Sequence, residues 1–323
     1  MNGNPTYGEV YREGAARLAE AGIEEAALDA RLLLEFVCGT DRNTLLVHGD
    51  RDVSEEEYGR YCGLTERRAA HVPLQHLTGV QDFMGLTFLV NGDVLVPRQD
   101  TEVLVEEAMK HLHDGMRILD MCTGSGCILL SLLHYSNDCE GVGVDLSGQA
   151  LAVAAENYKR QRMERPDMKA RFLEGDLFAA LENEKESERR TTLEQENTAE
   201  DGKTVADFVK PDGERNVPEK RFDIIISNPP YIKTDVIDTL MPEVREHEPV
   251  MALDGGTDGL IFYRKIAGNA GDYLNGGGML FFEIGCEQAE DVCRIMKTAG
   301  FREIAVVKDF AGLDRVVYGS WFG

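Results

Sequence analysis

The distribution of apolar and polar residues divides the chain into a helical N-terminal part and a longer part in which strands and helices alternate. From about Tyr7 to Val72, apolar residues recur at the three- and four-residue spacing of amphipathic helices. Ser54, followed by Glu57, is typical of the capping box that begins a helix. We therefore predict a small helical bundle over residues 1–75.

A linker that contains a β-hairpin is expected next, over residues 76–97. Apolar runs between Leu86 and Val96 flank the dipeptide Asn91-Gly92, which is typical of a tight hairpin turn. Pro97 then leads into a larger domain, which we expect to span residues 98–323 and to begin with a helix at 101–109.

Seven short apolar runs in the larger domain are typical of strands. They are residues 117–122, 141–144, 170–173, 222–227, 278–282, 303–307 and 315–318. Helical patterns separate most of them, which predicts an α/β fold with a mostly parallel seven-stranded sheet. Residues 310–314 form a tight turn between the last two runs, so the sheet should end in a C-terminal antiparallel hairpin.

Residues 182–221 have a different composition, because half of them are charged and few are apolar. Such a segment cannot bury enough apolar surface to offset the entropy lost on ordering. We expect a disordered surface insertion within the larger domain. A segment that binds a partner or regulates the protein is the alternative.

The formal net charge of −24 opposes tight nonspecific binding to nucleic acid, so DNA is not an expected partner. No run of 18 apolar residues predicts a membrane span, and the N-terminus lacks a signal-peptide pattern. The seven cysteines are odd in number and form no Cys-x-x-Cys pair, which favours reduced thiols over disulfides or a metal site. A cytoplasmic monomer without a metal is expected.

Glycine and acidic residues follow the first three predicted strands, at the edge where open α/β sheets bind ligands. The first strand, with Asp120 near its end, is followed by a glycine loop and a helix, as in a nucleotide-binding unit. Asp145, after the second strand, can accept both ribose hydroxyls, and Asp176, after the third, can accept from an adenine amine. Each aspartate alone is also typical of a helix cap or a turn.

The tetrapeptide Asn228-Pro229-Pro230-Tyr231 follows the apolar strand 222–227. The prolines lack backbone donors but keep their carbonyls as acceptors. The Asn228 oxygen and the Pro229 carbonyl can together hold both hydrogens of a planar amino group, and Tyr231 adds a flat face. The alternative interpretation is a stiff turn at the end of a strand.

These motifs resemble those of class I S-adenosylmethionine-dependent methyltransferases that methylate planar amino groups. Further segments narrow the resemblance to the HemK/PrmC family of release factor glutamine methyltransferases, and it covers the chain from about Tyr7 onward apart from the insertion. Those segments are Pro97–Glu102, Glu248–Pro249, Ala252–Gly256, Asp258–Leu260, Tyr263–Arg264 and Glu283–Gly285.

The resemblance implies a Rossmann-like fold and methyl transfer from S-adenosylmethionine, which leaves S-adenosylhomocysteine. The acceptor would be the side-chain amide nitrogen of the glutamine in the Gly-Gly-Gln motif of peptide chain release factors. The helical bundle would help to hold that protein substrate.

The resemblance also implies which residues form the site. Catalytic roles fall on Asn228, Pro229, Pro230 and Tyr231. Cofactor-binding roles fall on the strand-end residues Asp120, Cys122, Thr123, Gly124, Ser125, Gly126, Asp145, Asp176, Leu177 and Asn228.

Cys122 departs from the family, which usually has glycine there, and a positive φ at this position would strain a cysteine. Gln99 likewise replaces a common proline. Two other enzyme functions stay open: methylation of a glutamine in a ribosomal protein, and methylation of amino groups in DNA or RNA. A non-enzymatic module that binds S-adenosylmethionine without turnover is the alternative from another class.

Overall fold

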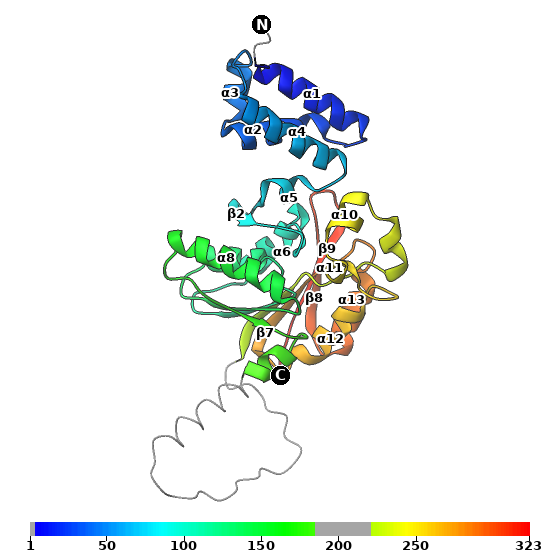
Figure 1. The fold of residues 1–323 in the computed structure, drawn as a ribbon. Helices are drawn as coiled ribbons and strands as arrows, with labels where there is room; N and C mark the ends of the chain where they lie inside the picture. Colours follow the sequence, from blue (N-terminus) through cyan, green and yellow to red (C-terminus); the bar gives the residue numbers. More distant parts are fainter. Residues whose placement is uncertain (1–3, 185–220) are drawn as a thin grey trace, which may run out of the picture.

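The computed structural model describes residues 4–184 and 221–323 of the chain, and the predicted insertion at 182–221 lies almost entirely outside these ranges. The N-terminal helices form a bundle at one end of the molecule, and the larger domain lies below them (Figure 1). Their bounds are α1 Tyr7–Glu20, α2 Ala26–Cys38, α3 Arg42–Val47, α4 Glu55–Ala69 and α5 Leu74–Thr78. The predicted helical character of this part is confirmed.

Capping boxes begin two helices of the bundle. The Ser54 side chain accepts from the Glu57 backbone, and Glu57 accepts in return from the Ser54 backbone, as the sequence predicts. Thr6 and Glu9 do the same at the start of α1. In the core, the Tyr61 hydroxyl donates to the Ala30 carbonyl at 3.2 Å.

The linker contains a hairpin, but the predicted position of its turn is wrong. Strands β1 Val80–Phe83 and β2 Leu86–Leu89 pair antiparallel, so the turn is Met84-Gly85 and not Asn91-Gly92. Met84 and Gly85 have φ of 52° and 72°, the left-handed values of a tight hairpin turn. Tertiary contacts hold Met84 in this conformation, because its N–H donates to Glu102 at 2.6 Å and its carbonyl accepts from Tyr135 at 2.6 Å.

The larger domain is built on a seven-stranded sheet with the order β5-β4-β3-β6-β7-β9-β8. Only β9 runs antiparallel to its neighbours, which confirms the mostly parallel sheet and its C-terminal hairpin. The strands are β3 Arg117–Met121, β4 Glu140–Asp145, β5 Lys169–Glu174, β6 Phe222–Ser227, β7 Leu274–Glu283, β8 Arg302–Lys308 and β9 Asp314–Ser320.

Helices cover both faces of the sheet. Successive residues of a strand point to opposite faces, and in these strands both sets of residues are largely apolar. Ile118 of β3 packs in one buried cluster with α6 and α7, whereas Leu119 packs in a second cluster with α12 and α13. The helices are α6 Gln99–Met109, α7 Cys127–His134, α8 Gly148–Glu164, α12 Ile261–Ala270 and α13 Ala289–Thr298. Three short helices lie between β6 and α12: η1 Thr234–Thr239, α10 Pro242–His247 and α11 Val250–Leu253.

In residues 4–184 and 221–323, no helix is both long enough and apolar enough to cross a membrane.

Arg68 of α4 connects the bundle to the larger domain. Its guanidinium donates to Asp29 of α2 at 2.7 Å and to Glu243 of α10 at 2.6 Å. Arg68 and Asp29 are both buried, so their charges depend on each other for compensation.

We expect Arg68→Met to lower the free energy of unfolding by about 3 kcal/mol, because it leaves the Asp29 carboxylate buried and unpaired. Urea unfolding of the full chain measures this change. The neighbouring Arg67 is exposed, so Arg67→Met is the matched control and should change stability by less than about 0.5 kcal/mol. Equal effects from the two variants would contradict the role of Arg68.

Candidate active site

The carboxyl ends of β3, β4 and β6 lie level with one another. In the parallel register, Met121 pairs with Val144 on one side and with Ser227 on the other. The Ser227 hydroxyl donates to the Met121 carbonyl at 2.6 Å in the buried interior. The loop after β3 and the Asn-Pro-Pro-Tyr loop after β6 therefore begin side by side.

The loop after β3 turns through left-handed backbone. Cys122, Gly124 and Gly126 have φ of 61°, 54° and 78°. Gly126 begins α7, and its N–H donates to the Thr123 carbonyl at 2.8 Å. Cys122 thus adopts the positive φ that suits glycine, at a cost of about 1–2 kcal/mol for a residue with a side chain.

Asp120 lies beneath this loop and does not line the pocket. It is fully buried, and its Oδ2 accepts from the Thr123 hydroxyl at 2.6 Å. Burial raises the pKa of Asp120 to about 7, against the lowering effect of that hydrogen bond. Asp120 therefore supports the loop through Thr123.

Asp145 ends β4 and lines the pocket. Oδ2 accepts from the Gly124 N–H at 2.9 Å and Oδ1 from the Ser147 N–H at 3.0 Å. Burial raises the pKa of Asp145, and the backbone donors oppose that rise. Because each carboxylate oxygen has a second lone pair, the group can also accept two hydroxyls of a ligand.

Asp176 and Leu177, which follow β5, also line the pocket. The Asp176 carboxylate is largely exposed and lies 3.5 Å from Lys265 Nζ. Leu177 is buried and has a φ of 52°. Leu146, Leu177 and Phe262 all line the pocket and give it apolar surface of the kind that suits a flat aromatic ring.

The structure brings most of the predicted site residues to one pocket. Four of the predicted residues do not line this pocket: Asp120, Gly126, Pro229 and Tyr231. Those that do are Cys122, Thr123, Gly124, Ser125, Asp145, Asp176, Leu177, Asn228 and Pro230.

Asn228 lies at this pocket with a defined amide orientation. Its Nδ2 donates to the Thr101 hydroxyl of α6 at 3.4 Å, which leaves Oδ1 as the free acceptor. Tyr231 points elsewhere: its hydroxyl donates to Glu283 Oε1 at 3.4 Å. Burial raises the pKa of Tyr231 above its usual range, so the hydroxyl stays protonated as a donor.

Hydrogen bonds and close packing support the backbone of the Asn-Pro-Pro-Tyr loop. Gln288 donates to the Tyr231 carbonyl at 3.1 Å and accepts from the Gly285 N–H at 2.9 Å. Gly255 packs so closely that a Cβ atom there would lie 2.7 Å from Tyr231 Cα. The Ala252–Gly256 segment thus holds the loop from one side and Gln288 from the other.

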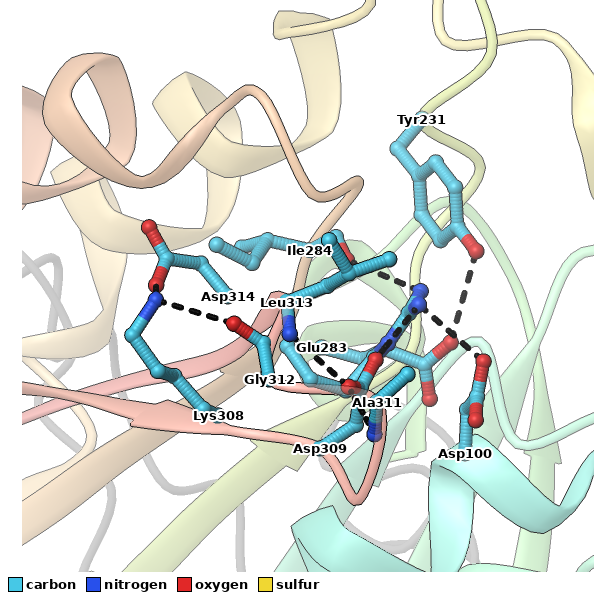
Figure 2. A network of polar contacts seen from close by, with 11 residues as sticks. Asp100, Tyr231, Glu283, Ile284, Lys308, Asp309, Ala311, Gly312, Leu313 and Asp314 are labelled. Carbon is cyan, nitrogen blue, oxygen red and sulfur yellow. Dashed lines mark hydrogen bonds and ion pairs between the residues drawn. The ribbon is translucent and has the colours of Figure 1, made fainter.

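Figure 2 shows the polar network next to Tyr231, which joins α6 to the β8–β9 turn. Arg315 of β9 lies 3.0 Å from both Asp100 and Asp309. Asp309 in turn accepts from the backbone N–H groups of Ala311 and Leu313 at 2.9 Å, which fixes the turn.

Glu283, at the end of β7, is fully buried beside this network. Burial raises its pKa to about 7, while Thr101, Arg315 and Tyr231 act in the opposite direction.

A second buried carboxylate, that of Glu248, contacts Arg98, which lines the pocket. The Arg98 guanidinium donates to both of its oxygens, at 2.7 and 2.8 Å. Burial raises the pKa of Glu248, and Arg98 opposes that rise. This contact attaches the segment after α10 to the start of α6.

Four further residues make contacts that support the site, although the sequence alone predicted no role for them: Thr101, Glu248, Glu283 and Gln288. The first three lie inside the segments that carry the family resemblance. A charged residue at the end of an otherwise apolar strand, as Glu283 is, was the one local signal available.

The strained backbone of Cys122 gives a stability prediction. Cys122→Gly should be at least as stable as the natural chain, because glycine adopts a positive φ without strain. Cys122→Val should lose about 1–2 kcal/mol, since a β-branched side chain is disfavoured there. Urea unfolding of both variants checks the order, and a valine variant as stable as the glycine variant would contradict it.

A family model described as the PrmC N-terminal domain matches residues 9–79, and one described as the methyltransferase small domain matches residues 98–188. A solved protein-(glutamine-N5) methyltransferase (release factor-specific) from Alicyclobacillus acidocaldarius is 27% identical, with a TM-score of 0.37, and covers 73% of this chain and 100% of that chain.

Two curated relatives match nearly the whole chain. The release factor glutamine methyltransferase of Geobacter sulfurreducens is 40% identical over 94% of this chain and 92% of its own length. The enzyme of the same name from Caulobacter vibrioides is 37% identical over 94% of this chain and 92% of its own length. Identity at this level over this span shows that the chain belongs to the family of release factor glutamine methyltransferases.

Proposed function

We propose that the protein transfers a methyl group from S-adenosylmethionine to the side-chain amide nitrogen of the glutamine in the Gly-Gly-Gln motif of peptide chain release factors. The observation that carries the proposal is Asn228, whose amide is oriented with Oδ1 free at the edge of a pocket lined by Asp145 and the glycine loop. An acceptor for a planar amino group thus lies beside a site for a nucleoside.

The residues of the pocket fit S-adenosylmethionine. The Asp145 carboxylate would accept the ribose hydroxyls, and Asp176 with the Leu177 backbone would bind the adenine. Thr123, Gly124 and the other loop residues would line the methionine portion. Bound there, S-adenosylmethionine supplies an electrophilic methyl group on a sulfonium sulfur.

The catalytic work of the protein is mainly positioning. An amide nitrogen is a poor nucleophile, because its lone pair is delocalised into the carbonyl. Asn228 Oδ1 and the Pro229 carbonyl would accept its two hydrogens and direct the nitrogen toward the pocket. The same oxygens stabilise the positive charge that develops on nitrogen. The nitrogen loses its proton only as the new bond forms, so no strong base is required.

We further propose that residues 1–75 recognise the protein substrate, that residues 76–97 link the two domains, and that residues 98–323 carry out the methyl transfer. A second hollow supports this division, since it is lined by bundle residues such as Leu28 together with Met241 and Pro242 of the larger domain. A cytoplasmic monomer that does not act on DNA fits the net charge of −24 and the seven free cysteines.

Incubating the enzyme with a purified release factor and isotopically labelled S-adenosylmethionine tests the proposal. Mass spectrometry should place one methyl group on the glutamine of the Gly-Gly-Gln motif. A label on another residue of the release factor, or none under conditions in which the cofactor binds, would contradict the proposed function.

Asn228→Ala should lower the single-turnover rate on the release factor about a hundredfold or more, because it removes one of two contacts that orient the nitrogen. Cofactor affinity should change little, since the Asn oxygen is assigned to the acceptor amide. Asn228→Asp keeps an acceptor and should retain partial activity. Asn137→Ala, at an exposed position outside the pocket lining, is the matched control, and a natural rate from Asn228→Ala would remove Asn228 from the mechanism.

Asp145→Ala should weaken S-adenosylmethionine binding at least a hundredfold, because it removes two charge-assisted hydrogen bonds of about 1.5–3 kcal/mol each. Asp176→Ala is the comparison and should cost less, since that carboxylate is largely exposed. Isothermal titration calorimetry measures both affinities. If the Asp145 variant folds and binds the cofactor normally, Asp145 serves only to hold the loop backbone.

A further inference from the structure

The turn between β8 and β9 carries four successive exposed residues without charge: Phe310, Ala311, Gly312 and Leu313. Phe310 is 91% exposed, the highest value of any large apolar side chain in the part of the chain that the structure describes. Single exposed apolar residues are common on protein surfaces, but contiguous ones mark contact sites. This turn is therefore a candidate for an interaction surface.

Hydrogen bonds hold the turn in one shape. The buried Asp309 side chain accepts from the backbone N–H groups of Ala311 and Leu313, both at 2.9 Å. The Asp309 N–H donates to the Leu313 carbonyl at 2.8 Å, and the Gly312 N–H donates to the Asp309 carbonyl at 3.0 Å. The turn thus presents Phe310 on an ordered backbone, so a partner that binds it has little backbone to immobilise.

The charged residues that flank the turn are paired with one another. Lys308 Nζ lies 2.7 Å from Asp314, and the Arg315 guanidinium lies 3.0 Å from Asp309. Although the chain has a net charge of −24, the tip of this turn presents apolar surface between compensated charges. The centres of protein–protein interfaces have this composition, since they are poor in charge and rich in aromatic side chains.

The turn leaves the sheet at the same edge as the Asn-Pro-Pro-Tyr loop. Val317 of β9 pairs with Phe282 of β7, which pairs on its other side with Ser227 at the end of β6. Two strand spacings, or about 10 Å, therefore separate the start of β9 from the end of β6. An ion pair of 3.0 Å between Arg315 and Asp100 joins the base of the turn to α6 (Figure 2).

A protein substrate that places a glutamine beside Asn228 has to cover this edge of the sheet. A stable interface takes about 800 Å² from each partner, which corresponds to a disc about 16 Å in radius. A turn about 10 Å from the Asn-Pro-Pro-Tyr loop falls within such a disc. The turn also borders the pocket, because Arg98 and Thr101, on either side of Asp100, both line it.

We propose that the β8–β9 turn is a docking surface for the release factor, and that Phe310 enters an apolar depression beside its Gly-Gly-Gln loop. Aromatic side chains that fill a pocket of the partner are typical binding hot spots. This inference rests on the proposed function, because the acceptor glutamine is what brings the release factor to this edge.

Phe310→Ala tests the docking surface. It should raise KM for the release factor at least tenfold, because it truncates the anchor of the interface. kcat at saturation should stay within about twofold, since the contact is the same before and during methyl transfer. Calorimetric titration of the release factor into enzyme saturated with S-adenosylhomocysteine should show the same loss of affinity. The affinity for S-adenosylmethionine should not change.

Two further variants make the test specific. Phe310→Leu keeps an apolar side chain and should recover most of the affinity for the release factor. Phe322→Ala is the matched control, because Phe322 is 51% exposed and follows the end of β9, at the opposite edge of the sheet. It should leave KM unchanged. Thermal melting confirms that each variant is folded, as expected for side chains that are exposed.

The outcomes separate this inference from the proposed function. A natural enzyme that neither binds nor methylates the release factor would overturn the function and this inference together. An active natural enzyme with a Phe310→Ala variant of equal KM and affinity would overturn only the docking surface. Sedimentation equilibrium of the enzyme alone covers the remaining occupant. A natural dimer that Phe310→Ala converts to a monomer would assign the turn to contact between copies and would also overturn the proposal.

Discussion

The site depends on the parallel alignment of β3 with β6. Met121 and Ser227 end these strands as register partners, and the Ser227 hydroxyl donates to the Met121 carbonyl at 2.6 Å. The loop that suits a nucleoside and the loop that suits a planar amide leave the sheet from these two residues. Their separation is therefore fixed by the strand spacing of a rigid sheet, which is the kind of support that precise positioning of two reactants requires.

Two buried carboxyl groups lie behind the two loops of the site. Asp120 holds the glycine loop through Thr123, and Glu283 lies behind the Asn-Pro-Pro-Tyr loop. Burial raises the pKa of each to about 7. Keeping such groups inside a protein lowers its stability unless hydrogen-bond donors compensate them, and here the Thr123 and Tyr231 hydroxyls donate to the two carboxyls.

Much of the fold was predictable from the sequence, because strand and helix periods are local properties. The seven strands and the strand-end loops follow from apolar runs and from the glycines beside them. The hairpin turn was misplaced because contacts from Glu102 and Tyr135, distant in sequence, hold Met84 in a conformation that its type disfavours. The direction of Tyr231 was equally invisible, since it depends on Glu283 at the end of another strand.

The position of strand β9 in the sheet determines when the sheet can be completed during synthesis. It lies between β7 and β8, so it enters a gap bounded by two strands that leave the ribosome before it. Its Arg315 also ties Asp100 of α6 to the β8–β9 turn. A growing chain can fold its N-terminal bundle early, but the sheet and the support behind Tyr231 stay incomplete until residues 314–320 have emerged. The seven-stranded sheet can therefore be completed only after residues 314–320 have been translated.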